Sequence, residues 1–314
     1  MLSADGPAII PADGAGLLTH FILAPAKVKR CLRCEGSFDL RGWTCPHCGW
    51  QPVEGEFRSF GASLRADDYP VDAYDKWLPF EEANNFWFIP RSRMISAALG
   101  RYFPAASSFL EVGCGAGSIL ARLSKDHPTT VLSGCELDPA ALRIARERVG
   151  GAELFCASAE SIPFQDEFDA AGAFDVLEHI EDDGVALAGI VQSVRPGGGV
   201  LISVPQHRWL WSAEDEYAGH KRRYRRRDLR DLLAKTGLES VRMTSYVFAP
   251  LPAMAITRMA SRNRDNFDQL EEGSKPPPGA AFLRSLLNAE VAAIDAGVSF
   301  PAGGSLFAVA RKPR

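Results

Sequence analysis

Four of the seven cysteines lie in two closely spaced pairs whose spacing suits a metal ion. Cys31 and Cys34 form one C-x-x-C pair, Cys45 and Cys48 form the second, and ten residues separate the pairs. Each pair can place two thiolates on one tetrahedral ion, and a short hairpin between them would bring all four together. Four thiolates complete the shell of Zn²⁺ and leave no position for water, so the pattern predicts a structural zinc ribbon. The alternative, a disulfide framework, is disfavoured in a reducing compartment.

A glycine-rich run forms the second chemical feature. Gly113, Gly115 and Gly117 follow a predicted strand and begin a predicted helix, so the backbone can pass close to a ligand there. Glu111 comes two residues before the first glycine. Its carboxylate would repel a pyrophosphate but attract an ammonium or a sulfonium. The run therefore predicts a ligand that is cationic at this end, as S-adenosylmethionine is.

A third feature is an acidic residue at the end of the next predicted strand. Glu136 follows Glu111 by 25 residues, at a position where a carboxylate accepts two hydrogen bonds from a ribose diol. Asp138 competes for this role, but Pro139 follows it directly. Because proline favours the first position of a helix, we interpret Asp138 as a helix cap.

The elements that must hold these residues alternate between strand and helix, which is typical of a doubly wound parallel α/β sheet. Apolar runs bounded by turn residues predict strands at 109–112, 130–135, 152–156, 168–173, 199–204 and 305–310. Helices are predicted from about 91 to 99, from 139 to 149, from 228 to 236 and from 282 to 295, and a mobile loop over 261–280. Cys114, Cys135 and Cys156 lie near strand ends 21 residues apart, and we interpret them as reduced core thiols.

Taken in order, these motifs resemble the class I S-adenosylmethionine-dependent methyltransferases of the type 11/12-like group, with an added N-terminal zinc ribbon. Further matches are the turn from Ser158 to Phe164, the stretch from Asp175 to His179, and Arg195-Pro-Gly-Gly198. The resemblance implies a Rossmann-like seven-stranded sheet behind a small zinc ribbon with four cysteine ligands. It also implies that S-adenosylmethionine is bound by Glu111, Gly113, Cys114, Gly115, Gly117, Glu136, Leu137, Ser158, Ala159, Glu160 and Asp175.

One residue departs from the pattern of these relatives. Many of them carry aspartate where this chain has Ser158. A hydroxyl can still pair with the adenine amino group, but with less charge assistance. We expect somewhat weaker cofactor binding as a result.

The chain divides, on this interpretation, into four segments. They are an irregular N-terminal lead over 1–28, the zinc ribbon over 29–52, a linker with a helical and aromatic cap over 53–107, and the S-adenosylmethionine-binding methyltransferase domain over 108–314. Because the ribbon and the cofactor site fall in different segments, mutating the ribbon is expected to leave cofactor affinity largely intact.

Histidines are the candidates for the methyl-acceptor side, since transfer to a hydroxyl needs a base. His179, His220 and His207 follow the fourth and fifth predicted strands, where the methyl group would point. Seven of the ten residues 221–230 are Lys or Arg. Such a run is either a solvated helix start or a patch for a phosphate or carboxylate of the substrate. The aromatic segment 80–95 and the loop 205–224 are expected to pack together as a lid over an apolar pocket.

Composition limits the class of protein. The 314 residues are 46% hydrophobic with a formal charge of −4, which fits a folded protein and gives no support for a polycationic nucleic-acid binder. No apolar stretch reaches the roughly 20 residues of a membrane span, and no signal peptide is evident, so we expect a cytoplasmic protein.

The resulting expectation is an enzyme that methylates oxygen or nitrogen of a small molecule, such as a lipid-linked, sugar or natural-product intermediate. Its acceptor would carry an anionic group on an apolar body. Nucleic acid is a less favoured partner, and the sequence does not predict the oligomeric state. The alternatives are an rRNA guanine methyltransferase that uses the ribbon on RNA, and a non-catalytic binding module on the same fold.

Overall fold

A computed structural model describes residues 28–39, 43–61, 73–262, 264 and 267–314 of the chain. The predicted N-terminal lead, apart from Val28, lies outside the described residues. Within the described part, eight strands form one sheet in the order β10-β11-β9-β8-β4-β5-β6-β3. Their bounds are β3 (Arg58–Ser59), β4 (Ser108–Val112), β5 (Val131–Glu136), β6 (Glu153–Cys156), β8 (Phe168–Phe174), β9 (Val194–Pro205), β10 (Glu239–Tyr246) and β11 (Ser305–Arg311).

The sheet is parallel except at one side, where β11 runs antiparallel to both β9 and β10. Seven strands match the expected Rossmann-like sheet, and β3 adds a two-residue edge beside β6. The six predicted strands are all present. β10 was not predicted, because its first residues, Glu239 to Val241, are exposed and largely polar at the open edge of the sheet.

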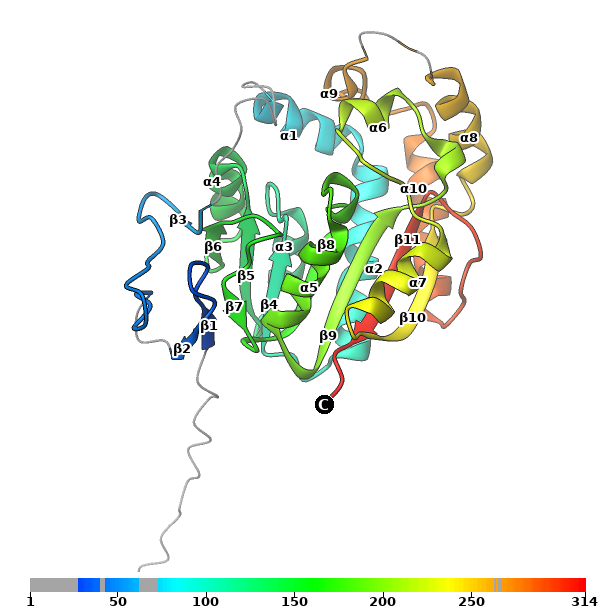
Figure 1. The fold of residues 1–314 in the computed structure, drawn as a ribbon. Coiled ribbons are helices and arrows are strands. Elements are labelled where there is room, and N and C mark those ends of the chain that lie inside the picture. Colours follow the sequence, from blue (N-terminus) through cyan, green and yellow to red (C-terminus); the bar gives the residue numbers. More distant parts are fainter. Residues whose placement is uncertain (1–27, 40–42, 62–72, 263, 265–266) are drawn as a thin grey trace, which may run out of the picture.

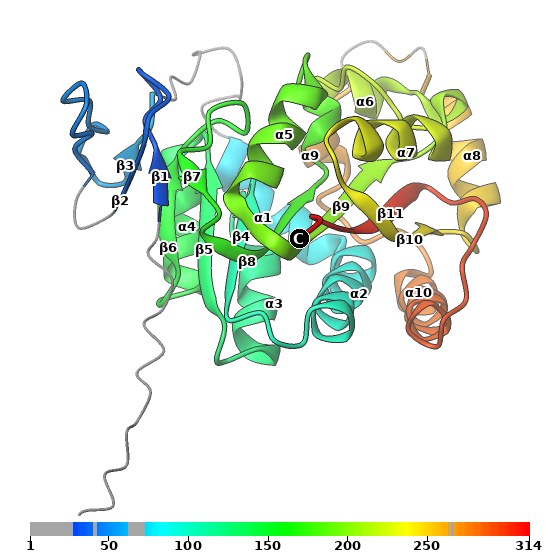
Figure 2. The same cartoon turned by 60° about the horizontal axis from the view of Figure 1, so that its bottom comes forward.

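Helices cover both faces of the sheet (Figure 2). One apolar core lies under α2 (Asn85–Tyr102), α3 (Ser118–Asp126), α4 (Pro139–Arg148) and α10 (Ala280–Asp295). The other core lies under α5 (Asp183–Ser193) and α7 (Arg226–Lys235). Because both faces are covered, the central strands β4, β5 and β8 are buried along most of their length and show no alternation of buried and exposed residues, as in other buried parallel sheets.

Four further helices gather above the carboxyl ends of the parallel strands (Figure 1). They are α1 (Ala73–Ala83), α6 (Ala213–Tyr217), α8 (Leu251–Ala260) and α9 (Gln269–Glu272). The prediction of a structureless loop over 261–280 is wrong at α9, because Asp268 caps this helix with two hydrogen bonds and α1 packs against it. α2 also begins earlier than predicted, before Pro90, because its long contact with α10 outweighs the helix-breaking effect of proline.

The N-terminal strands β1 (Val28–Arg30) and β2 (Ser37–Asp39) belong to a separate small sheet that packs beside the large one. β1 pairs with β2 and with β7 (Phe164–Gln165), which gives this small sheet the order β2-β1-β7. Trp43 lies within 4.9–6.2 Å, centroid to centroid, of Phe60, Phe155 and Phe164. The ribbon is therefore packed on the strand layer around β6. Among the described helices, none has both the length and the apolar character that a membrane crossing requires.

Candidate functional site

The glycine run forms a tight loop between β4 and α3. Gly113, Gly115 and Gly117 have φ values of 70°, 49° and 77°, a region that L side chains rarely adopt. A Cβ at Gly113 would lie 2.5 Å from Val176, and one at Gly117 would lie 2.9 Å from Ala145. At Gly115 no atom lies within 4 Å of that position. The loop is thus packed at its two ends and open at its centre, where a ligand can approach the backbone.

Glu136 ties the end of β5 to this loop. Its carboxylate accepts hydrogen bonds from the backbone N–H of Gly115 at 3.0 Å and of Leu137 at 2.6 Å, with Asp138 N at 3.4 Å. Burial raises the pKa of Glu136 above its usual range. Asp138 caps α4 by accepting from Ala140 N at 2.7 Å through Oδ1, as predicted.

Glu111 lies beneath the loop as a buried carboxylate that lacks a full set of partners. The residue is 3% exposed, and its Oε2 atom has no hydrogen-bond partner. Burial raises the pKa of Glu111 to about 8, although the Arg91 charge acts in the opposite direction. A buried acceptor without a donor is costly to maintain. The position therefore suits a ligand that brings a cationic donor.

Asp175 follows β8 in a left-handed conformation with a φ of 59°. Its side chain accepts from Ser203 Oγ at 3.1 Å and from Arg91 Nη2 at 2.5 Å. Arg91 belongs to α2, is 6% exposed, and lies 5.0 Å from the centroid of the Trp87 ring. The sequence did not single out Arg91. In the sequence, Arg91 is marked only by its place directly after the aromatic segment. Its partner Asp175 lies 84 residues further along the chain, so no local pattern joins the two.

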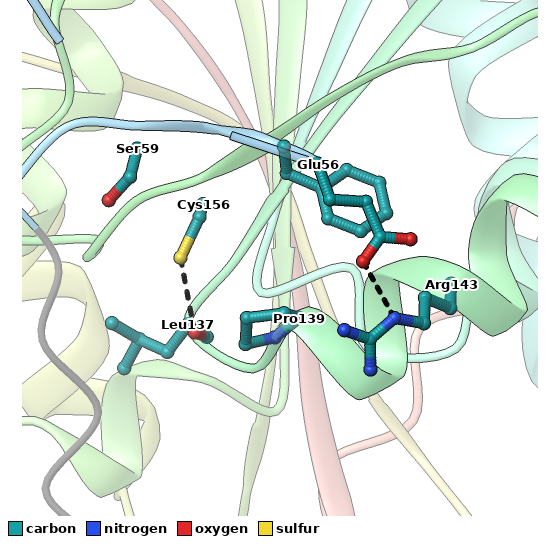
Figure 3. A pocket seen from close by; sticks show the side chains of 7 residues that line it. Glu56, Ser59, Leu137, Pro139, Arg143 and Cys156 are labelled. Carbon is teal, nitrogen blue, oxygen red and sulfur yellow. Dashed lines mark hydrogen bonds and ion pairs between the residues drawn. The ribbon is translucent and has the colours of Figure 1, made fainter. Parts of the chain in front are cut away.

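The turn after β6 presents the remaining predicted cofactor residues. Ser158 Oγ accepts from the Glu160 N–H at 3.2 Å, and Ala159 is buried. Cys114 is also buried, beside the glycine loop. A cavity of about 340 Å³ opens nearby (Figure 3). It is lined by Glu56, Phe57, Ser59, Leu137, Pro139, Arg143 and Cys156.

Figure 3 shows how this cavity is bounded. Arg143 Nε donates to Glu56 Oε2 at 2.8 Å, and Cys156 Sγ donates to the Leu137 carbonyl at 3.3 Å. Leu137 is the one lining residue that was also predicted to bind the cofactor. The cavity thus adjoins the predicted cofactor residues along the outer side of β5 and β6.

Two of the three candidate catalytic histidines lie together. The rings of His179 and His220 are 4.7 Å apart, centroid to centroid, and nearly perpendicular. His179 belongs to η1 (Leu177–His179), directly after β8, and its pKa is lowered to about 4 by burial and by the neighbouring His220. His207 instead lies 5.4 Å from the Trp209 ring, in a left-handed conformation with a φ of 66°.

His220 is fixed by a buried acid that sequence reasoning did not identify. Asp215 is fully buried, and its Oδ1 atom lies 2.8 Å from His220 Nδ1. Three further donors reach the same carboxylate: Arg223 Nε at 2.7 Å, Arg258 Nη1 at 3.0 Å and Ser212 N at 3.0 Å. These contacts hold the pKa of Asp215 down at about 2, against the effect of burial.

Three arginines of the basic run 221–230 are bonded within the protein, whereas Lys221, Arg225, Arg227 and Arg230 are exposed. Arg223 is 3% exposed and bonds Asp215 and the Gln206 carbonyl. Arg222 pairs with Asp183 at 2.9 Å, and Arg226 donates to the carbonyls of Met243 and Phe300. The expectation of a free anion-binding rim is wrong for these three arginines, which join α7 and its preceding loop to neighbouring elements.

The aromatic segment and the loop after β9 were expected to pack on each other. α1 packs on α9, and α2 packs on α10, α3 and β9. Asn84 Nδ2, between α1 and α2, donates to the Gly273 carbonyl at 2.8 Å. The loop after β9 contacts α8, where Arg258 reaches Asp215. Trp209 is 49% exposed. The direct lid contact stays a prediction.

The four ribbon cysteines bring their sulfur atoms together. Cys31 Sγ lies 3.5 Å from Cys48 Sγ, and Cys34 Sγ lies 3.7 Å from Cys45 Sγ. All four atoms lie within 4.8 Å of one another. Thiolates at about 2.3 Å from a tetrahedral ion are separated by roughly 3.8 Å, so the donor set fits Zn²⁺.

Known proteins resemble the middle part of this chain in sequence. Residues 88–242 match the family model of a methyltransferase domain. The O-methyltransferase cnsE of Penicillium expansum is 34% identical over 101 residues, which cover 30% of this chain and 36% of that protein. A dTDP-3-amino-3,4,6-trideoxy-alpha-D-glucopyranose N,N-dimethyltransferase of Streptomyces venezuelae is 31% identical over 43% of this chain and 57% of its own.

Among solved structures, phosphoethanolamine N-methyltransferase 2 of Haemonchus contortus, in complex with phosphomonomethylethanolamine and S-adenosylhomocysteine, has the same fold. It gives a TM-score of 0.53 at 21% identity and covers 81% of this chain and 61% of its own. The chain thus spans less than two thirds of the length of each of these three proteins.

Proposed function

Because residues 88–242 carry a methyltransferase domain of this family, we propose that the chain transfers the methyl group of S-adenosylmethionine to an oxygen or nitrogen of a small molecule. The observation that carries the proposal is the open glycine loop between the buried carboxylate of Glu111 and the half-buried carboxylate of Glu136. Glu111 Oε2 lacks a hydrogen-bond donor, and Glu136 already orders the loop by accepting from the Gly115 N–H. When bound, the cofactor supplies an electrophilic methyl group on a sulfonium.

The chain's residues then have separate tasks in holding the cofactor. Glu111 and the backbone around Gly115 face its cationic methionine end, and Glu136 accepts the ribose hydroxyls. Leu137, Ser158 and Ala159 hold the adenine, with Glu160 behind Ser158. Asp175, fixed by Arg91, orients the amino-acid part from the end of β8.

Calorimetry with S-adenosylhomocysteine tests this assignment. We expect one site per chain, and we expect Glu136→Ala to weaken binding by about 1.5–3 kcal/mol, the range for hydrogen bonds to a charged group. Glu136→Gln keeps an acceptor for Gly115 and should lose less. Asp138→Asn keeps the helix cap and serves as the matched control. Unchanged affinity in Glu136→Ala would refute the ribose assignment.

The acceptor belongs on the side of His179 and His220. His179 follows β8 closely and the His220 ring lies 4.7 Å from it, centroid to centroid. The relatives named above include an O-methyltransferase and an N,N-dimethyltransferase of a sugar nucleotide. We assign these two residues, and not His207, to orienting or activating the acceptor atom. Mass spectrometry of metabolite extracts incubated with methyl-labelled S-adenosylmethionine should reveal labelled small molecules, and label confined to RNA or protein would overturn this class.

The rRNA alternative loses part of its support in the basic run, because Arg222, Arg223 and Arg226 bond to the protein itself. A purified protein should therefore show the same ultraviolet absorbance ratio before and after nuclease treatment. A drop in absorbance at the nucleic-acid maximum would favour RNA.

Cys31, Cys34, Cys45 and Cys48 are proposed to hold one structural Zn²⁺. The support is the approach of four thiols that two C-x-x-C pairs supply from one short segment. Metal analysis should find zinc that is lost in Cys45→Ser. A Cys45→Ser variant with the full zinc content would contradict the assignment.

A further inference from the structure

A second group of metal-ligating side chains lies on the acceptor side, apart from the four thiols. Glu178, His179 and His220 each offer one ligand atom, and these atoms all lie within 4.8 Å of one another. Two of the residues are adjacent in η1, and the third comes from the loop after α6, 41 residues further on. The backbone fixes this approach, because Lys221 N donates to the Glu178 carbonyl at 2.7 Å.

The surroundings of Glu178 point to a bound ligand. The residue is fully buried, and neither of its carboxylate oxygens has a hydrogen-bond partner. His220 Nε2 lies 4.0 Å from Glu178 Oε1. The two neighbouring guanidinium groups are bonded elsewhere, Arg91 to Asp175 and Arg223 to Asp215. A buried carboxylate without donors costs several times what a hydrogen bond contributes, so a cation at this position would remove a large penalty.

The histidines are held as metal-binding histidines usually are. A ligating imidazole normally uses its second nitrogen on a carboxylate or a backbone carbonyl, which fixes the tautomer and the ring orientation. His220 Nδ1 bonds the buried Asp215, which leaves Nε2 directed toward Glu178. The His179 ring has the backbone of Ala218 as its hydrogen-bond partner.

From these observations we infer that Glu178, His179 and His220 bind a divalent transition-metal ion. Two imidazoles and one carboxylate suit Zn²⁺, Fe²⁺, Co²⁺ or Mn²⁺, and are not the all-oxygen set that Mg²⁺ or Ca²⁺ prefers. Ligand bonds of about 2.0–2.2 Å allow at most roughly 4.4 Å between two donor atoms. Small side-chain rotations, of about an ångström or less, are therefore needed to close the site.

Three protein ligands leave positions open for water or for a substrate atom. The rings of His179 and His220 are partly exposed, so that side of the ion faces outward. An acceptor hydroxyl bound there would lose its proton more easily, because the ion stabilises the oxyanion. This last step rests on the proposed function, whereas metal binding itself does not.

The test is a titration of untagged, zinc-loaded full-length protein with Co²⁺, followed by calorimetry and by visible absorption. We expect one Co²⁺ per chain beyond the zinc already bound, with a spectrum that lacks thiolate charge-transfer bands. Glu178→Gln and His220→Ala should each weaken this site by about 100-fold or more, at or beyond the upper end of what outer-shell mutations cost. Glu181→Gln removes an exposed carboxylate three residues away and should change nothing.

S-adenosylhomocysteine affinity and thermal unfolding are measured on every variant. A variant that still binds S-adenosylhomocysteine but has lost Co²⁺ supports the metal site. Wild-type protein that binds S-adenosylhomocysteine but no additional Co²⁺ overturns the metal site and leaves the proposed function standing. Co²⁺ binding that vanishes in Cys45→Ser and survives Glu178→Gln also overturns it. Failure of the wild type to bind S-adenosylhomocysteine instead counts against the proposed function.

Discussion

At the scale of single residues, three carboxylates that are buried or half-buried define the site. Glu111, Glu136 and Glu178 lie near the carboxyl ends of β4, β5 and β8, and burial raises the pKa of each. Only Glu136 has a set of backbone donors. The other two are maintained at a cost in stability that ligands can recover, which is common where a site is built for binding.

Glu111 gives the cofactor-free protein a specific pH dependence. Its pKa is raised from 4.5 to about 8 on folding. Below pH 4.5 the group is protonated in both states, and above that value the unfolded chain releases the proton first. The contribution of Glu111 to stability is therefore fully present below about pH 4.5 and is lost as pH rises through about 8. Chemical denaturation at a series of pH values should show this slope in wild type and its reduction in Glu111→Gln.

Cofactor binding should depend on pH in the opposite direction. A ligand ammonium favours the ionised form of Glu111, so S-adenosylhomocysteine affinity should rise between pH 6 and 8. In Glu111→Gln this rise should disappear and the affinity at pH 8 should fall by about tenfold or more. Calorimetry across this range measures both. The same rise in Glu111→Gln as in wild type would show that another group is responsible.

At the scale of elements, arginines from separate segments form ion pairs that join the helices and loops above the carboxyl ends of the strands. Arg91 joins α2 to the end of β8, and Arg258 joins α8 to α6. Arg223 joins the loop before α7 to the same buried acid, Asp215. The Arg223–Asp215 pair is buried on both sides, so removing one member leaves the other charged and buried.

Arg223→Glu should therefore destabilise the whole fold. Arg223 and Asp215 are 3% and 0% exposed, and breaking a pair of this kind costs about 3–5 kcal/mol. Arg225→Glu with Arg230→Glu changes two exposed charges of the same run and should stay within about 0.5 kcal/mol per substitution. Urea denaturation compares them. Equal stability of the two variants would mean that the run is a surface feature after all.

The ribbon gives the second prediction at this scale. Lys29 and Glu167, 4% and 2% exposed, form an ion pair of 2.6 Å between β1 and the residue before β8, and Trp43 packs on Phe155 of β6. Cys45→Ser should lower the melting temperature of the catalytic part as well. It should weaken S-adenosylhomocysteine binding less than Glu136→Ala does, since none of the proposed cofactor residues belongs to the ribbon. Thermal unfolding of both variants measures the change in melting temperature, and calorimetry compares their S-adenosylhomocysteine affinities.

At the scale of the whole molecule, the sequence predicted the features that are local in the chain. The strands, the glycine loop, the Asp138 cap and the two cysteine pairs each depend on residues within a few positions of one another. The contacts of Arg91 with Asp175 and of His220 with Glu178 join residues 84 and 42 positions apart, respectively, and no single-sequence pattern encodes such pairs. For the same reason the attachment of β1 to β7, across more than 100 residues, was not predicted.

Both ends of the eight-stranded sheet are protected against pairing with another chain. At one end, β10 has an irregular register between Ser240 and Arg242, which interrupts its free edge. At the other end, the two residues of β3 pair with Phe155 and Cys156 of β6. The segment that supplies β3 follows directly after the ribbon, and Phe60 next to it packs on Trp43.

We therefore expect the ribbon to limit self-association as well as to stabilise the fold. If loss of zinc loosens Trp43, β3 is free to leave, and β6 then offers unpaired backbone groups that other molecules can extend. When the ribbon has lost its zinc, we expect light scattering that increases with protein concentration. This increase should precede any loss of secondary structure. Glu136→Ala leaves the ribbon intact and should not show this light scattering. The colloidal stability of the protein would then depend on a metal that takes no part in its chemistry.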